Sequence, residues 1–214
     1  MKVSFHNSIE EISKKSWDAL IGDLNYPFLR HDFLKTLEIT NCVGTNTGWI
    51  PIHITIERDE ELIAAMPLYL KSHSQGEFVF DHSWANAFYQ HGLDYYPKLV
   101  SSIPHTPASG PRFLLKDGEE KSVLFEKIKE GVKMISSKNN ISSWHILFPE
   151  KDEINFYENS QLSIRKNAQF IWFNKNYKNF ENYLENFRSR HRKNVLKERN
   201  KIKEQDLIIE TLSG

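Results

Sequence analysis

The sequence predicts a folded domain of the α/β or α+β class, in which a meander of strands precedes a helical crossover. One observation is a pair of apolar runs, residues 49–57 and 62–70, joined by a short charged turn. Another is a helical pattern over residues 119–139, followed by a strand pattern over residues 143–148. The composition agrees, because 39% hydrophobic and 26% charged residues are typical of a folded chain.

The chain opens with a predicted strand over residues 2–6 and two predicted helices. Ser8 can cap the first helix through its side-chain oxygen, and the Asn-Tyr-Pro sequence at residues 25–27 ends it. Asp32 can cap the second helix. These signals predict a strand and two short helices before the meander begins.

The run at residues 49–57 carries the clearest strand pattern. Its even positions from 50 to 56 are all isoleucine, whereas His53, Thr55 and Glu57 occupy the other face. Residues 62–70 are expected to return as its antiparallel partner. Pro67 has no N–H for the strand ladder, so it predicts a bulge, an edge or a splayed pair.

Later elements follow from the same patterns. The helix at residues 119–139 has a stripe that includes Leu124, Ile128 and Ile135, which predicts that it packs across the sheet. The remaining expected elements are strands at residues 98–103, 143–148 and 207–212, a paired strand region at 162–173, a short helix at 150–159 and one long helix at 178–205.

Charge and cysteine content exclude several classes of protein. Lys plus Arg and Asp plus Glu are equal at 28 each, so the overall charge favours neither nucleic acid nor membrane binding. Cys42 is the single cysteine, which excludes an intrachain disulfide. The histidines lack metal-ligand spacing, so no metal site is predicted. The start of the sequence lacks a signal-peptide pattern and no membrane span is seen, so a cytoplasmic protein is expected.

Residues 66–112 differ in composition from an ordinary surface loop. They combine aromatic rings with titratable side chains, which is the composition of a pocket wall. Within them, FVFDHSWANAF, GLDYYPKL and PHTPASGPRFL resemble the signature of the FemAB-like "peptidoglycan biosynthesis/recognition" family, whose members are predicted N-acyltransferases of the GNAT superfamily. PFLRHDFLKTLE and RSRHRKNVLKERNKI are similar as well.

The resemblance covers nearly the whole chain and implies a GNAT-like fold, a mixed and mostly antiparallel central sheet flanked by helices. Because family members are about twice this length, it also implies that the chain is the N-terminal part of a longer protein. The expected domains are a GNAT-like domain at residues 1–177, a basic connecting helix at 178–205 and the first strand of a second domain at 206–214.

The central stretch contains three candidate catalytic residues, Asp81, His82 and His105. Histidine titrates near neutral pH and a carboxylate can orient it, so this combination suits proton transfer. The alternative is that Asp81 caps a turn and the histidines are surface or core residues. No nucleophile motif is present, so direct acyl transfer to an amine is expected if chemistry occurs.

Candidate substrate-binding residues surround these groups. Aromatic rings pack on sugar or peptide faces, and a cation pairs with phosphate or carboxylate. Residue by residue, core filling explains the rings equally well. The candidates are Trp84, Tyr95, Tyr96, Lys98, Thr106 and Arg112. With Asp81, His82 and His105 they are expected to converge on one concavity.

The resemblance implies acyl-CoA or aminoacyl-tRNA as the donor, with no tightly bound cofactor. In GNAT enzymes a Gly/Arg-rich loop holds the coenzyme pyrophosphate, but here residues 104–118 contain three prolines and lack RxxGxG spacing. The basic face of the last helix can hold phosphates of tRNA, although a solvated helix is the alternative. Its candidate residues are Arg188, Arg190, Arg192, Lys193 and Lys197.

Two functions of different classes therefore stay open. One is an acyl- or aminoacyltransferase linked to peptidoglycan or the cell envelope, in which this chain recognises a small-molecule or peptidoglycan-precursor acceptor. The other is a binding module without catalysis that has lost the donor site. A homodimer formed through the C-terminal helix and strand is also expected, because an unpaired apolar strand seeks a partner.

Overall fold

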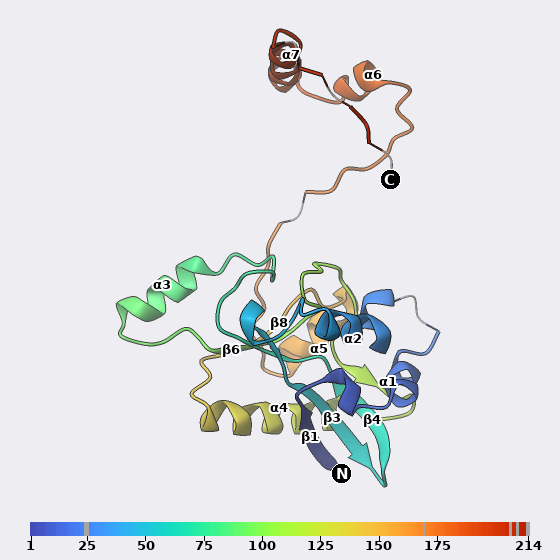
Figure 1. The fold of residues 1–214 in the computed structure, drawn as a ribbon, viewed down its shortest axis with the longest axis vertical. Helices are drawn as coiled ribbons and strands as arrows, with labels where there is room; N and C mark the ends of the chain where they lie inside the picture. Colours follow the sequence, from blue (N-terminus) through green and yellow to red (C-terminus); the bar gives the residue numbers. More distant parts are fainter. Residues whose placement is uncertain (24–25, 169, 206, 209, 213–214) are drawn as a thin grey trace. The chain divides into compact units, whose positions relative to one another are not determined.

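The computed structural model describes residues 1–23, 26–168, 170–205, 207–208 and 210–212. The contacts divide the chain into two compact units, Met1–Arg165 and Lys166–Gly214. This division precedes the expected domain boundary at residue 177. Figure 1 shows the helices and strands of both units.

The first unit contains two four-stranded sheets, with strand orders β1-β3-β4-β7 and β2-β5-β6-β8. All neighbouring strands are antiparallel except β6 and β8, which are parallel. The predicted mixed and mostly antiparallel sheet arrangement is confirmed. The strands are β1 (Lys2–His6), β2 (Trp49–Pro51), β3 (His53–Arg58), β4 (Glu61–Met66), β5 (Tyr69–Lys71), β6 (Lys98–Ser101), β7 (Leu114–Leu115) and β8 (Trp144–Ile146).

Helices flank these sheets. The first predicted helix is divided, because Ser8 caps a short 3-10 helix (Ile9–Glu11) and Ser13 caps α1. Asp32 lies in the first turn of α2 and not at its cap. The helices of the first unit are α1 (Lys14–Ile21), α2 (His31–Ile39), α3 (His82–Gln90), α4 (Lys121–Lys138) and α5 (Ile154–Asn159), with further 3-10 turns at Pro27–Leu29, Thr45–Thr47 and Lys151–Glu153.

The predicted hairpin of residues 49–57 and 62–70 is confirmed, and it contributes to both sheets. Its first part pairs β3 with β4, and its second pairs β2 with β5. The change of sheet occurs beside Pro67, as the missing N–H predicts. There the backbone N–H of Leu68 donates to His53 Nδ1 at 3.3 Å. The buried His53 side chain therefore accepts the hydrogen bond of Leu68 at the point where the two strands of the hairpin separate.

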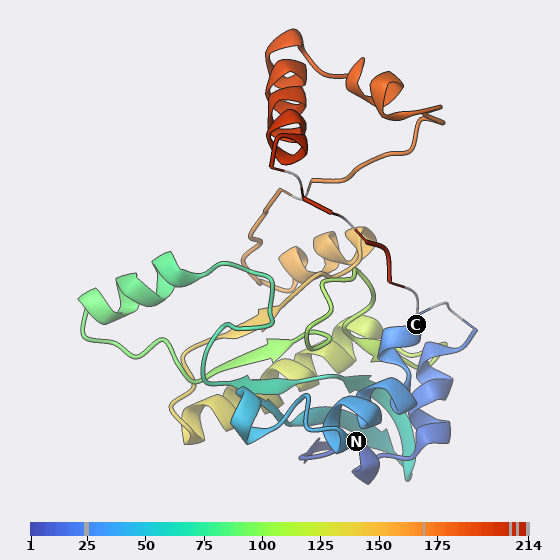
Figure 2. The same cartoon turned by 45° about the horizontal axis from the view of Figure 1, so that its top comes forward.

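Helix α4 covers one face of the sheet that contains β3 and β4. Leu124 and Ile128 are buried in one core cluster with Ile54 and Ile56, and Ile135 packs at its edge. The predicted packing of this helix is therefore confirmed. Helices α1 and α2 cover the opposite face through a second core cluster. Figure 2 shows α4 and the two N-terminal helices on opposite sides of the strands.

Two expectations for residues 72–173 differ from the structure. Helix α3 lies in the stretch whose composition predicts a pocket wall, and no helix is predicted there. The predicted strand region at residues 162–173 is not formed in its described residues, 162–168 and 170–173. Leu162 and Ile164 pack against the core, but Phe170 to Phe173 are exposed. A strand pattern needs a neighbouring strand, and an isolated extended segment is not stable as a sheet.

The second unit contains α6 (Phe180–Leu184) and α7 (Ser189–Lys203). The prediction of one long helix over residues 178–205 was wrong. Between the two helices, the Asn186 side chain donates to the carbonyls of Asn182 and Tyr183. Such local side-chain bonds compete with helix propagation. The ring of Tyr183 also contacts those of Tyr177 and Phe187, which gives this unit its own aromatic cluster.

The expected final strand at residues 206–214 falls partly outside the described residues. Positions 207–208 and 210–212 are described and form no strand, and Leu207, Ile208 and Leu212 are exposed. Among the described residues, no helix combines the length and the apolar character needed to cross a membrane.

Candidate functional site

Two lysines occupy directly opposite positions on neighbouring strands. Lys71 ends β5, Lys98 begins β6, and the antiparallel register pairs them. Both are fully buried. Like charges placed opposite each other destabilise a sheet, and buried charges need partners. The sequence meets this requirement with the segment that follows β5, residues 72–81, which supplies the carboxylates.

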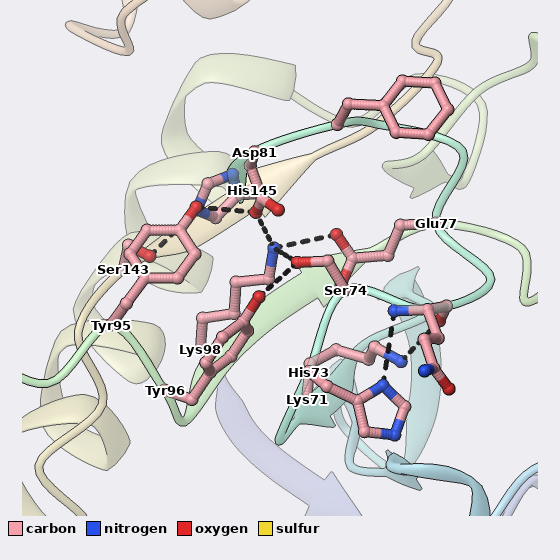
Figure 3. A network of polar contacts seen from close by, with 12 residues as sticks. Lys71, His73, Ser74, Glu77, Asp81, Tyr95, Tyr96, Lys98, Ser143 and His145 are labelled. Atoms are coloured by element: carbon pink, nitrogen blue, oxygen red, sulfur yellow. Dashed lines mark hydrogen bonds and ion pairs between the residues drawn. The ribbon is translucent and has the colours of Figure 1, made fainter. Parts of the chain in front are cut away.

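Lys98 is the centre of the polar network in Figure 3. Its Nζ donates to Asp81 Oδ2 at 2.5 Å, to Glu77 Oε2 at 2.8 Å and to Ser74 Oγ at 3.1 Å. Both carboxylate residues are at most 2% exposed. An ammonium group has three N–H donors, so Lys98 is fully satisfied by these partners. We call Ser74, Glu77, Asp81 and Lys98 the Lys98 cluster.

Lys71 takes a different set of partners. Its Nζ lies 3.8 Å from the centre of the Trp49 ring and donates to the carbonyl of Gln75 at 3.1 Å. Burial, opposed by the charge of Glu77 and assisted by that of Lys98, lowers the pKa of Lys71 to about 8. A cation over an indole ring is stabilised by the ring's negative face. Lys71 and Lys98 therefore lie opposite each other in the sheet but bind different partners.

Tyrosines that precede β6 complete the network. The Tyr95 hydroxyl donates to Asp81 Oδ2 at 2.7 Å, and burial raises the pKa of this phenol. The Tyr96 hydroxyl shares a hydrogen bond of 2.6 Å with Ser74. The sequence Tyr-Tyr-Pro-Lys therefore places three neighbouring side chains on the segment of residues 72–81.

The two carboxylates of the Lys98 cluster differ in their pKa values. Burial alone would raise the pKa of Asp81, but hydrogen bonds from Lys98, Ser74 and Tyr95 outweigh it and lower that pKa to about 2. For Glu77, burial outweighs the charge and hydrogen bond of Lys98, so its pKa is raised. Neighbouring titratable groups whose pKa values are pushed apart are typical of acid–base sites. Glu77 is therefore the better proton acceptor at neutral pH.

Strand β8 brings a histidine to the same region. His145 pairs with Val100 of β6, and its ring centre lies 6.2 Å from that of Tyr95. Its Nε2 shares a 2.9 Å hydrogen bond with Ser143 Oγ. Burial, together with the charge of Lys98, lowers the pKa of His145 to about 4. This imidazole is consequently neutral at physiological pH.

Two oxygens of the Lys98 cluster can accept a further hydrogen bond. Glu77 Oε1 and Asp81 Oδ1 are buried without a partner among the described residues. An unpaired buried acceptor costs free energy, so each oxygen is a place where a donor N–H or O–H gains a favourable contact. The arrangement can therefore receive a polar hydrogen and, at Glu77, a proton.

The other predicted catalytic and substrate-binding residues make their contacts outside this cluster. His82 and Trp84 are exposed on α3, and the Arg165 guanidinium lies 5.9 Å from the Trp84 ring centre. His105 Nε2 lies 3.2 Å from the carbonyl of Cys42. Thr106 donates to the carbonyl of Pro104. Of the predicted site residues, Asp81 and Lys98 belong to the Lys98 cluster, and Tyr95 and Tyr96 bond to it through Asp81 and Ser74.

Arg112 makes its contacts elsewhere. It is 1% exposed, and its guanidinium donates to backbone carbonyls of Leu147, Gly110, Pro111 and Ala108. The expectation of one concavity shared by Asp81 and Arg112 is therefore corrected to two separate sets of contacts. The reason is that Arg112 lies beyond the turn after β6, where it fixes the turn by binding its carbonyl groups.

The loop at residues 104–118, which lacks the RxxGxG spacing of a pyrophosphate-binding loop, uses several of its N–H groups internally. Those of Thr106, Gly110 and Lys116 donate to backbone carbonyls of Ile103, Phe148 and Ile63. Helix α4 then begins after Glu119 and Glu120, and Glu119 pairs with Arg58 at 2.7 Å. Carboxylates at a helix N-terminus compete with a bound anion for the same positive end of the helix dipole.

The predicted phosphate-binding residues belong to the second unit. Arg188 is the N-cap of α7, and Arg190, Lys193 and Lys197 are exposed on the helix. Arg192 is half-buried and donates to the carbonyl of Phe187. The basic face of α7 is therefore largely available to solvent.

Sequence reasoning did not select Lys71, Ser74, Glu77 and His145 as site residues. The useful signal was the strand register. Once residues 69–71 are paired with residues 98–100, Lys71 and Lys98 lie opposite each other in a buried sheet. Two buried cations then require nearby carboxylates, and Glu77 and Asp81 are the acidic residues of the intervening segment before α3.

A family model described as FemAB-like, peptidoglycan biosynthesis/recognition, matches residues 8–214. The chain belongs to the FemAB-like family. The resemblance inferred from the central motifs is thereby confirmed. No curated protein matches the chain.

Several solved structures of acetyltransferases are similar to this chain at low sequence identity. An aminoglycoside antibiotic 6'-N-acetyltransferase from Acinetobacter haemolyticus has a TM-score of 0.47 at 11% identity, covering 82% of this chain and 98% of its own. A ribosomal-protein-alanine N-acetyltransferase from Brucella melitensis has a TM-score of 0.48 at 7% identity, covering 81% and 100%. A glucosamine-6-phosphate N-acetyltransferase from Arabidopsis thaliana has a TM-score of 0.44 at 10% identity, covering 81% and 100%.

Proposed function

We propose that this FemAB-like chain recognises the acceptor in an N-acyl or N-aminoacyl transfer linked to peptidoglycan or cell-envelope biosynthesis. The observation that carries the proposal is the family match over residues 8–214, whose description concerns peptidoglycan. The acceptor is a small molecule or peptidoglycan precursor that carries an amine, and the donor is acyl-CoA or aminoacyl-tRNA.

The Lys98 cluster suits the acceptor side of such a reaction. An amine must lose a proton as it attacks a carbonyl, and a carboxylate of raised pKa can take that proton. Glu77 has the raised pKa and an unpartnered oxygen, whereas the low pKa of Asp81 makes it a weak base. In this proposal Glu77 accepts the proton, while Asp81 positions Lys98 and Tyr95.

Access to Glu77 requires movement of the segment that carries it. Residues 72–81 connect β5 to α3, and Glu77 is 2% exposed. Loops that close over a substrate commonly exclude water from an active site and complete it. We therefore assign residues 72–81 the role of a cover over the acceptor amine.

The basic face of α7 suits an RNA-linked donor. Its exposed cations would neutralise phosphates of tRNA, with a steep dependence of affinity on salt. The residues assigned to this contact are Arg188, Arg190, Arg192, Lys193 and Lys197.

A second candidate function is a binding module without catalysis. It is favoured by the internal use of N–H groups in the loop before α4 and by the acidic residues at the start of that helix. Both features disfavour a coenzyme pyrophosphate. Such a module would bind the acceptor and no donor.

Calorimetric titration with acetyl-CoA, an aminoacyl-tRNA and a soluble peptidoglycan precursor separates these functions. We expect binding of the precursor and of one donor, and transfer to the precursor amine. Binding of aminoacyl-tRNA should weaken steeply as salt rises. Precursor binding without any donor binding would favour the second function. Failure to bind the precursor would overturn both.

The role of Glu77 is tested with Glu77→Gln. We expect a loss of transfer rate of about 10²–10⁴-fold with precursor affinity nearly unchanged, since the amide cannot take the proton. Glu126→Gln on the exposed surface of α4 is the matched control and should keep the full rate. An unchanged rate in Glu77→Gln would exclude Glu77 as the base.

A further inference from the structure

A separate cavity lies between the 3-10 turn Pro27–Leu29 and the turn that follows β6. Its volume is about 160 Å³, roughly the liquid volume of five water molecules, so it fits a group the size of a small amino acid. The lining residues are Tyr26, Pro27, Phe28, Leu29, Ile103, Ala108, Ser109, Gly110 and Arg112.

Arg112 gives this mostly apolar cavity a positive charge. Its Nε donates to Leu147 O at 2.8 Å, Nη1 to two carbonyls and Nη2 to Ala108 O at 2.5 Å. A guanidinium has five N–H donors, so one N–H of Nη2 is left over. Among the described residues, Arg112 forms no ion pair with a carboxylate. A buried guanidinium that has an N–H left over and no ion pair attracts a small anion.

Two acidic residues near Arg112 each have a hydrogen-bonded partner, although Glu153 Oε2 is buried without a partner among the described residues. Glu150 accepts a hydrogen bond from the Tyr26 hydroxyl, which raises the pKa of Tyr26 to about 12. Glu153 pairs with Lys121 at 3.0 Å. Burial lowers the pKa of Arg112 to about 10, with opposing effects from Glu153, Tyr157 and Glu150, so the guanidinium stays charged at neutral pH. One uncompensated N–H beside two carboxylates favours a monoanion over a doubly charged phosphate.

From these observations we infer that the cavity binds a small monocarboxylate with a short apolar group. The remaining Arg112 N–H and the Ser109 hydroxyl face the carboxylate, while Leu29 and Ile103 contact the apolar group. Hydrogen bonds from a guanidinium to a carboxylate are among the stronger ones in proteins. This site does not depend on the Lys98 cluster or on the proposed transfer reaction.

The site is tested on the full chain by NMR titration with N-acetyl-alanine, using N-acetyl-alaninamide as the uncharged isostere. We expect saturable shifts of the Arg112 Nε–H and Gly110 amide signals with the acid and none with the amide. Equal shifts with both compounds would overturn the proposal. Inorganic phosphate is the third probe, and tighter binding of phosphate than of the acid would overturn the assignment to a monocarboxylate.

Arg112 itself binds four carbonyl groups, so its replacement can prevent folding. The better variant is Ala108→Phe, which fills the cavity from its half-buried wall and keeps the guanidinium. We expect its affinity for N-acetyl-alanine to fall about tenfold or more, a loss of about 1.4 kcal/mol. Ala87→Phe on the exposed face of α3 is the matched control and should bind normally. Unchanged affinity in Ala108→Phe would show that the ligand binds outside the cavity.

Discussion

Lys98 shows how one residue determines the conformation of a whole segment. Its three N–H donors reach Ser74, Glu77 and Asp81, which all belong to the segment between β5 and α3. Replacing a partner leaves a buried charge without compensation, which costs far more than an exposed pair gains. The segment is therefore held over the sheet by charge and hydrogen bonds as much as by apolar packing.

The lowered pKa of Asp81 predicts an acid-dependent part of the stability. A carboxylate with a depressed folded-state pKa stabilises the fold above its unfolded pKa, and this contribution disappears as pH falls through the folded value. With a folded pKa of about 2 and an unfolded value near 4, it amounts to about 2–3 kcal/mol and is lost between about pH 4 and pH 2. Asp81→Asn should lack it.

The measurement is the free energy of unfolding of both proteins against pH. We expect the wild type to exceed Asp81→Asn by about 2–3 kcal/mol at pH 6, with the difference shrinking toward pH 2. Asp117→Asn, at an exposed position, is the control and should leave the profile unchanged. A difference that is constant with pH would mean that Lys98 does not lower the pKa of Asp81.

For single residues, the sequence predicted which side chains belong to the site better than it predicted which groups they contact. Asp81, Tyr95, Tyr96 and Lys98 were chosen for their chemistry and do form one network. Arg112 was grouped with them because its motif flanks the strands that were expected to frame one cleft. Its actual partners are backbone carbonyls, which carry no signature in the sequence, so its separation from the Lys98 cluster was not predictable.

Helix α4 illustrates how an element is fitted to the sheet beneath it. Gly131 lies in its middle, and a Cβ there would come within 3.2 Å of Ile54 Cδ1 and of Val3 Cγ1. Glycine normally weakens a helix interior by about 1 kcal/mol relative to alanine. At this position the missing side chain allows close packing of the helix on β1 and β3.

We therefore expect Gly131→Val to lower the free energy of unfolding by about 1–3 kcal/mol, because the added methyl groups overpack the core. The same side chain at exposed Lys133, in the variant Lys133→Val, should change it by less than about 1 kcal/mol. Denaturant titration of both variants gives the comparison. A Gly131→Val protein as stable as the wild type would show that α4 can move away from the sheet at little cost.

Elements with an apolar pattern and a nearby partner were predictable, and those without a partner were not. The isoleucine face of β3 fixes its hairpin and its contact with α4, and both appear as expected. Residues 162–173 carry a similar pattern, yet their described part forms no strand. Pairing depends on another strand being available at the sheet edge, which local sequence does not encode.

For the molecule as a whole, the stabilising core belongs to one unit. The three buried clusters and the residues packed against them all come from residues 3–164. The second unit carries many of the exposed large hydrophobic residues, including Phe170, Trp172, Ile208 and Leu212. Exposed apolar groups of this kind favour association with another surface.

We accordingly predict that the protein forms a homodimer through its C-terminal unit. Shortening the chain to residues 1–165 should give a monomer, because it removes the exposed apolar segments and leaves the core clusters intact. Light scattering measures the mass of each protein, and denaturant titration measures stability at one protein concentration. Dimerisation adds stability that depends on protein concentration, and the shortened chain should lose this part of the stability and little more. A shortened chain that still dimerises would place the interface on the first unit, whereas one that fails to fold would show that the first unit depends on residues 166–214 for its core.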